Sequence, residues 1–117
     1  MDYKKTRSYL LSRPEAREDF PFGPEVAVMK ISDKMLATLS QSDGTARMNL
    51  KCEPEQALML RDIFPAVLPG YHMNKTHWNT VELQADVPGE LLRQLVDHSY
   101  ERVVAGLSKR LRDELAL

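Results

Sequence analysis

The sequence contains a single cysteine, Cys52, and no long apolar run. One cysteine excludes an intrachain disulfide and fits a reducing compartment, because disulfides persist mainly in oxidising ones. Without an apolar stretch of about 20 residues, no membrane-spanning helix is expected, and the first residues lack the apolar core of a secretory signal. We therefore expect a cytoplasmic protein that makes no use of a membrane.

An excess of one charge is also missing. The chain has 16 lysine and arginine residues against 17 aspartate and glutamate residues, which gives a formal net charge of −1 at pH 7. Domains that coat nucleic acid are usually basic, so this balance argues against extensive coating. A local basic patch remains compatible with it, because local fields depend on where charges lie. The length of 117 residues is that of one ordinary domain, expected here over residues 1–117.

Apolar periodicity and turn signals divide the chain into segments. Apolar residues that recur every three or four positions predict helices, whereas alternation predicts half-buried strands. Asp43-Gly44 predicts a tight hairpin, because both residues tolerate positive φ angles, and Phe20 and Phe22 are expected to hold a proline-rich loop to the core. The expected elements are a helix over 2–12, a loop over 14–25, strands over 26–31, 34–41 and 45–51, a helix from Pro54 to Pro65, strands over 67–73 and 78–85, a long helix from near Pro88 to Gly106 and a short helix after Ser108.

This order, α-β-β-β-α-β-β-α-α, is typical of an α+β fold. In the strand over 45–51, Met48 and Leu50 face inward while Arg47 and Lys51 face outward. A sheet with one apolar face must be covered by helices on that face, and its other face can stay solvated. We therefore expect a two-layer sandwich in which helices cover one face of an antiparallel sheet of about five strands.

Residues 72–83, HMNKTHWNTVEL, hold the densest group of polar and aromatic side chains, including the only tryptophan. If a strand begins at Trp78, alternation places its ring on the face of Thr80 and Glu82. A ring exposed there would be a stacking platform for a base or another ligand. The alternative is that the ring folds over the sheet edge and packs under a loop or helix, since aromatic rings are usually largely buried.

Phosphate is a natural partner for the cations of this region, because arginine and lysine form strong charge-assisted hydrogen bonds with it. Arg47 and Lys51 share one strand face, and Lys75 and His77 would join them if the 72–78 loop approaches that face. An ordinary solvated sheet face is the alternative. The expected nucleic-acid-binding residues are Arg47, Lys51, His72, Asn74, Lys75, His77 and Trp78.

Neither a metal site nor a catalytic site is recognisable in the sequence. His72 and His77 lack the spacing of a helical zinc pair, and the lysine between them is not a ligand that zinc prefers. The charge of Glu53 opposes formation of a thiolate at Cys52. Motifs for a serine nucleophile, a phosphate-binding loop or a dinucleotide site are missing. We expect no metal, no cofactor and no enzymatic activity.

The H-x-N-K-x-H-W pattern at residues 72–78 resembles the motif of the MmcQ/YjbR family, with its matches at His72, Asn74, Lys75, His77 and Trp78. The segments MNLKCEPEQALML and LVDHSYERVV are similar to the family's strand–helix junction and C-terminal helix, so the resemblance spans nearly the whole chain. It implies a "double-wing" α+β fold, grouped with CyaY-like or secretion-chaperone-like architectures. Members of this family are predicted to bind DNA, so the resemblance implies DNA binding here as well. It identifies no catalytic residues.

Three functions follow, in order of preference. The first is weak, salt-sensitive binding of DNA or another nucleic acid. The second is a non-enzymatic module that binds a protein or peptide on its sheet face, and the third is a small-ligand or anion site at the 72–78 loop. The chain is expected to be a monomer or a small homo-oligomer.

Overall fold

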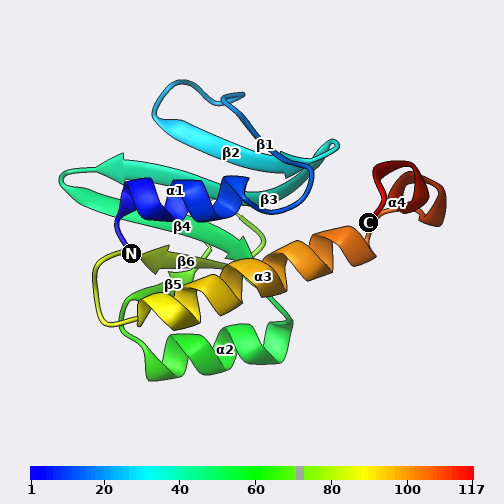
Figure 1. Ribbon diagram of the computed structural model, residues 1–117. Helices are drawn as coiled ribbons and strands as arrows, with labels where there is room; N and C mark the ends of the chain where they lie inside the picture. The colour runs from blue at the N-terminus through cyan, green and yellow to red at the C-terminus, as the bar shows by residue number, and fades with distance from the viewer. Residues whose placement is uncertain (71–72) are drawn as a thin grey trace.

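The computed structural model of the protein describes residues 1–70 and 73–117. Over these residues the elements follow the order α-β-β-β-β-α-β-β-α-α (Figure 1). Their bounds are α1 Tyr3–Leu11, β1 Ala16–Asp19, β2 Val26–Ile31, β3 Lys34–Ser42, β4 Thr45–Lys51, α2 Pro54–Ile63, β5 Val67–Pro69, β6 Trp78–Glu82, α3 Gly89–Ala105 and α4 Lys109–Leu115.

The strands form one antiparallel sheet in the order β1-β2-β3-β4-β6-β5. Leu39 lies opposite Met48, and Met48 lies opposite Val81, so the three buried side chains share one face. Helices α1, α2 and α3 lie on the same side of the sheet (Figure 1). The expected α+β architecture, with helices on one face of an antiparallel sheet, is confirmed.

The segment 14–25 is not a loop throughout, because β1 forms within it and pairs with β2. Two ion pairs accompany this strand, from Glu18 to Arg7 at 2.7 Å and from Asp19 to Lys30 at 3.0 Å. The sequence of β1, ARED, has little β-propensity, so local pattern could not reveal a strand that tertiary pairing creates. The described sheet therefore has six strands rather than about five.

The expected packing of Phe20 and Phe22 on the core is wrong. Phe20 is 46% exposed and Phe22 is 71% exposed. Both belong to the connection from β1 to β2, which lies at the outer edge of the sheet, away from α2 and α3 (Figure 1). Because β1 is an edge strand, this connection lies away from the helical layer, and the two rings have no apolar core to pack against.

The hairpin between β3 and β4 forms as predicted. Asp43 and Gly44 adopt φ angles of 53° and 77°, which is the backbone that a tight hairpin turn needs. The last two strands are shorter than expected. β5 ends at Pro69, which cannot donate a backbone hydrogen bond, and β6 ends before Gln84, whose φ angle is 57°.

Helix α3 supplies the long apolar stripe that the sequence predicted. Its buried residues are Leu92, Leu95, Val96, Ser99 and Val103. The helix stops at the C-cap residue Gly106, and Ser108 then caps α4 by accepting a hydrogen bond from the Leu111 N–H at 3.1 Å. Figure 1 shows α3 crossing the sheet and α4 standing beyond its end. None of the helices in the described ranges has both the length and the apolarity needed to cross a membrane.

Candidate functional site

The residues that lead into β6 form a tight turn. The carbonyl of Asn74 accepts hydrogen bonds from the N–H groups of His77 and Trp78 at 3.2 and 2.9 Å. The Asn74 side chain accepts another from the Thr76 N–H at 2.9 Å. The Trp78 carbonyl in turn accepts a hydrogen bond from the Gly70 N–H at 2.9 Å. Asn74 therefore shapes the turn from within.

Arg61 of α2 fastens this turn to the helical layer. Its Nε donates to the Asn79 side-chain oxygen at 2.6 Å. Its terminal nitrogen donates to the carbonyl of Lys75, and to that of Trp78 at 3.3 Å. The Asn79 amide in turn donates to the Ala57 carbonyl at 3.3 Å. The charged donor thus bonds the Lys75 carbonyl and adds a second hydrogen bond to the Trp78 carbonyl, which the Gly70 N–H also reaches, so Arg61 has a positioning role.

Three consecutive backbone N–H groups tie the end of β4 to its surroundings. Lys51 donates to Ser99 Oγ at 3.0 Å, Cys52 to the His77 carbonyl at 2.7 Å, and Glu53 to His98 Nε2 at 3.2 Å. Helix α3 and the turn before β6 therefore meet at this link.

Ser99 sets the distance between α3 and the sheet. Its hydroxyl is fully buried, accepts from the Lys51 N–H and donates to the Leu36 carbonyl at 2.8 Å. Because the same hydroxyl bonds β3 and β4, α3 is held against both strands. The residues one turn further along α3 therefore lie next to the ends of these strands.

Helix α2 begins directly after this link. The Glu53 carboxylate accepts hydrogen bonds from the N–H groups of Gln56 and Glu55 at 3.1 and 3.2 Å. These hydrogen bonds lower the pKa of Glu53, because they stabilise its charged form. Pro54 follows at the first helical position, where its missing N–H is no loss.

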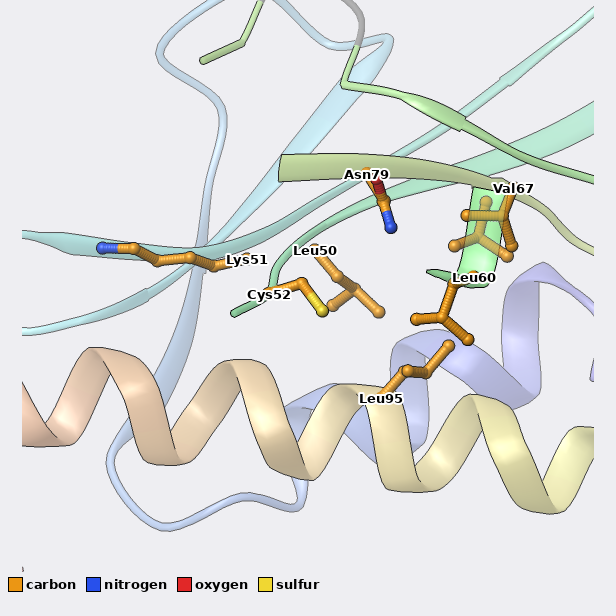
Figure 2. A pocket seen from close by; sticks show the side chains of 8 residues that line it. Leu50, Lys51, Cys52, Leu60, Val67, Asn79 and Leu95 are labelled. Carbon is orange, nitrogen blue, oxygen red and sulfur yellow. The ribbon is translucent and has the colours of Figure 1, made fainter. Parts of the chain in front are cut away.

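An apolar cavity of about 10 Å³ lies beneath the same link. Figure 2 shows the side chains of Leu50, Cys52, Leu60 and Leu95 around it. Burial raises the pKa of the Cys52 thiol, and the charge of Glu53 raises it further. The cysteine is therefore an inert core residue. The Lys51 side chain points away from this cavity (Figure 2).

A second, open cleft of about 260 Å³ lies where Lys51 points, between the C-terminal part of α3 and the ends of three strands. We call it the basic cleft. Lys34 borders it from β3, Lys51 from β4 and Arg102 from α3, and no carboxylate lies among its described lining residues. Its lining consists of Lys34, Met35, Lys51, Trp78, Arg102, Val103 and Gly106.

The cations of the basic cleft form no ion pair. Within the described residues this holds for Lys34, Lys51 and Arg102, although the charge of Arg102 contributes to lowering the pKa of the nearby Glu53 carboxyl. The Nε atom of Arg102 is buried and has no hydrogen-bond partner there. A buried donor without an acceptor is unfavourable.

The structure brings only part of the sequence-predicted set together. Lys51 and Trp78 are paired across β4 and β6, and both line the basic cleft. Arg47, at the other end of β4, lies opposite Glu82 and forms an ion pair with it at 3.6 Å. The prediction for His72 lies outside the described residues.

The remaining predicted cation lies beside α2 rather than beside Lys51. Lys75 is exposed and borders a groove that Pro54, Leu58 and Arg61 also line. Asn74 is exposed and His77 half-buried, and their backbones form the turn described above. The four cationic side chains therefore do not converge on one face in the way that alternation suggested.

Trp78 is buried, with 8% of its surface exposed. The prediction of a solvent-exposed stacking platform, which alternation allowed, is wrong, because the side chains on this face of β6 are buried at this point. Thr80, two residues further along the same face, is only 4% exposed and donates a hydrogen bond to the Asn49 side chain at 2.5 Å. The tryptophan forms a wall of the basic cleft and not a free stacking surface.

Sequence reasoning missed four residues that shape this region: Lys34, Arg61, Asn79 and Arg102. Asn79 did leave a signal, because it occupies an inward position of a strand otherwise lined with apolar residues. Arg102 left a weaker one, three residues after Ser99 and beside the buried stripe of α3. Lys34, the first residue of a strand, gave no local sign of its role.

The described residues contain no group of three or more histidine, cysteine, aspartate or glutamate side chains placed to hold a metal ion. The basic cleft has the opposite character, since cations and a tryptophan surround it. Such a donor set favours an anionic ligand.

Fold and cleft together define a small two-layer α+β protein whose six-stranded sheet carries a basic cleft at one end. The family model described as YjbR matches residues 11–102, and the chain belongs to this family. It is 38% identical to the Escherichia coli O157:H7 protein YbdF over 92% of this chain and 88% of the relative. It is 30% identical to YjbR of Escherichia coli K12 over 96% of this chain and 95% of that protein.

Solved structures support the same assignment. A crystal structure of a DUF419-domain protein from Deinococcus radiodurans superposes with a TM-score of 0.90 at 38% identity, over 97% of this chain and 87% of that chain. A Pseudomonas syringae protein superposes with a TM-score of 0.79 at 28% identity, over 88% of this chain and 99% of that chain. The names of YbdF and YjbR describe both as uncharacterized, so these similarities establish family and fold without an activity.

Proposed function

We propose that this protein binds nucleic acid, and that the basic cleft is where it contacts phosphate. The observation that carries the proposal is the convergence of Lys34, Lys51 and Arg102, from three different elements, on a cleft without a carboxylate among its described lining residues. Phosphate contacts supply most of the affinity of proteins for nucleic acid and position the bound strand.

The remainder of the charge distribution supports this location. Arg7, Arg13, Lys30 and Arg47 are each paired with a carboxylate, at distances between 2.7 and 3.6 Å. A paired cation must break its ion pair before it can bind phosphate. The unpaired cations of the cleft carry no such cost. Lys4, Lys5 and Arg93 also form no ion pair among the described residues and line an open groove of their own. That groove includes the Asp2 carboxylate, so phosphate is expected in the basic cleft first.

The overall charge sets the expected strength. With a net charge of −1, long-range attraction to nucleic acid is missing and binding depends on local contacts. Affinity should therefore be modest and should fall with salt. The role that fits these features is binding without catalysis, because the described lining of the cleft offers neither a hydroxyl or thiol nucleophile nor a carboxylate base.

An NMR titration of the labelled protein with duplex DNA, single-stranded DNA and RNA at low salt tests the proposal. We expect the backbone signals of residues 34–35, 51, 78 and 102–106 to shift together, and those of α1 to stay in place. Shifts confined to β1 and the β1–β2 connection, or no shift with any of the three ligands, would contradict it.

The outward face of α2 favours a second candidate function, the binding of a protein partner. Leu58, Met59 and Ile63 are each more than half exposed, although this helix also buries an apolar face against the core. A helix that is apolar on both sides normally has a partner on each. Glu55 and Asp62 are exposed beside these residues, whereas the exposed Lys75 borders Leu58. An amphipathic helix whose basic flank faces Glu55 and Asp62 is therefore the occupant that matches in charge.

Binding of a synthetic leucine–lysine amphipathic peptide, compared with a leucine–glutamate peptide of the same spacing, tests this second candidate. We expect only the basic peptide to bind, and the Met59→Glu variant to weaken that binding. Equal binding of both peptides, or binding that Met59→Glu leaves unchanged, would rule out a specific site on α2.

A further inference from the structure

We infer that the basic cleft recognises one terminal phosphate, a phosphomonoester at the end of a nucleic-acid strand, rather than a series of backbone phosphates. This inference rests on the proposed function and names its ligand more closely. Three features carry it: the confinement of the positive charge, the size of the cleft and the number of free donors.

The positive charge is local. Along β4, the next cation after Lys51 on the same face is Arg47, which is paired with Glu82. On β2, Lys30 is paired with Asp19. A strand laid across the sheet from the cleft would therefore meet neutralised pairs and their carboxylates instead of further free cations. This arrangement disfavours a continuous backbone path from the cleft across the sheet.

The cleft is also small and bounded. Its volume of about 260 Å³ lies just below the range of roughly 300–1,000 Å³ that is usual for small-molecule sites. Trp78 closes one side, and Val103 of α3 and the C-cap residue Gly106 form another. A site of this size accepts one phosphate with part of its attached nucleoside, whereas a tract of strand needs a groove open at both ends.

The donors match a phosphomonoester better than a diester. A monoester carries a charge of about −1.5 to −2 at pH 7 and three strong acceptor oxygens. A backbone diester carries one charge. Lys34 and Lys51 offer ammonium groups, and Arg102 offers a guanidinium. Three cationic donors can thus neutralise the dianion and pair with its three oxygens.

The test compares one fluorescently labelled oligonucleotide in three forms: 5′-phosphorylated, 3′-phosphorylated and without a terminal phosphate. Competition with inorganic phosphate and with a nucleoside 5′-monophosphate identifies the source of the phosphate. We expect at least one phosphorylated form to bind about tenfold more tightly than the unphosphorylated strand. We also expect Arg102→Lys to reduce this preference, because lysine lacks the planar guanidinium that can pair with two phosphate oxygens at once, while Lys4→Ala on α1 leaves it unchanged.

Equal affinity for all three forms would overturn the inference and leave the proposed function standing. Failure of every oligonucleotide to bind would overturn the proposed function itself. If the nucleoside monophosphate binds more tightly than the phosphorylated strand, the cleft is a mononucleotide site and strand-end recognition is wrong. Circular dichroism of Arg102→Lys and Lys4→Ala checks that a lost preference does not reflect unfolding.

Discussion

Lys51 and Trp78 are register partners across β4 and β6, so the only tryptophan of the chain lies beside a lysine at the end of the sheet. Their side chains form adjoining parts of the basic cleft. Because Trp78 is only 8% exposed, its emission reports on this one site and on whether the site is closed.

The first prediction concerns this tryptophan. In the folded protein we expect Trp78 to emit at short wavelength and to resist quenching by the neutral quencher acrylamide, since little of the ring is exposed. Urea should shift the emission to longer wavelength and restore quenching. Emission at the wavelength of free tryptophan in the folded state, with full acrylamide access, would contradict the buried position.

The second prediction concerns Arg61. Arg61→Ala removes a charged donor from Asn79 and from the carbonyls of Lys75 and Trp78, so unfolding should become easier by about 2 to 3 kcal/mol. Arg110→Ala is the matched control, because that side chain is 87% exposed and should matter by no more than about 0.5 kcal/mol. Urea unfolding of both variants measures the difference. Equal stability of the two would show that Arg61 does not fasten the turn.

The third prediction compares two glycines. A Cβ at Gly70 would lie 2.7 Å from the Trp78 Cβ and 2.8 Å from its carbonyl oxygen. Gly70→Ala must therefore push β6 away, at a cost of about 1 to 3 kcal/mol. At Gly106 the φ angle is −80° and the nearest atom would be 3.5 Å away, so Gly106→Ala should be neutral or stabilising by up to about 1 kcal/mol. The opposite order of melting temperatures would contradict the close approach at Gly70.

The fourth prediction concerns Cys52. Its pKa lies above the ordinary value of 9.0, because burial and Glu53 both disfavour the thiolate. Alkylation by iodoacetamide at pH 8 should be much slower than in the urea-unfolded chain. The raised pKa also fixes the sign of the pH dependence: this stabilising contribution is complete below pH 9 and is lost as the pH rises further. Rapid alkylation of the folded protein would contradict the buried thiol.

Much of the fold was predictable because periodicity and turn chemistry act locally. Short stretches of sequence were enough to predict the alternation of β4, the hairpin at Asp43-Gly44 and the buried stripe of α3. β1 was not predictable, since its residues favour no strand and only pairing with β2 makes it one. The exposure of Phe22 follows from the same edge position.

The candidate site was only partly predictable for a different reason. Alternation placed Lys51 outward, as the structure has it, but it could not show that α3 brings Arg102 alongside. That proximity depends on Ser99. Its hydroxyl bonds the Lys51 N–H of β4, 48 positions earlier in the chain, and the Leu36 carbonyl of β3, 63 positions earlier. Nor could it show that Glu82 lies opposite Arg47 and neutralises it, because strand pairing is a tertiary choice.

The central claim is that the basic cleft binds nucleic acid through its unpaired cations, and fluorescence anisotropy with a labelled oligonucleotide tests it most directly. Wild-type protein should bind at low salt, with affinity falling as salt rises by a slope of about −1 to −2, as expected for one or two phosphates. Lys51→Glu and Lys34→Glu should each weaken binding by about tenfold or more. Lys4→Glu makes the same change of charge on α1 and should have little effect. If all three variants lose affinity equally, or if the folded wild-type protein binds no nucleic acid at low salt, the claim is wrong.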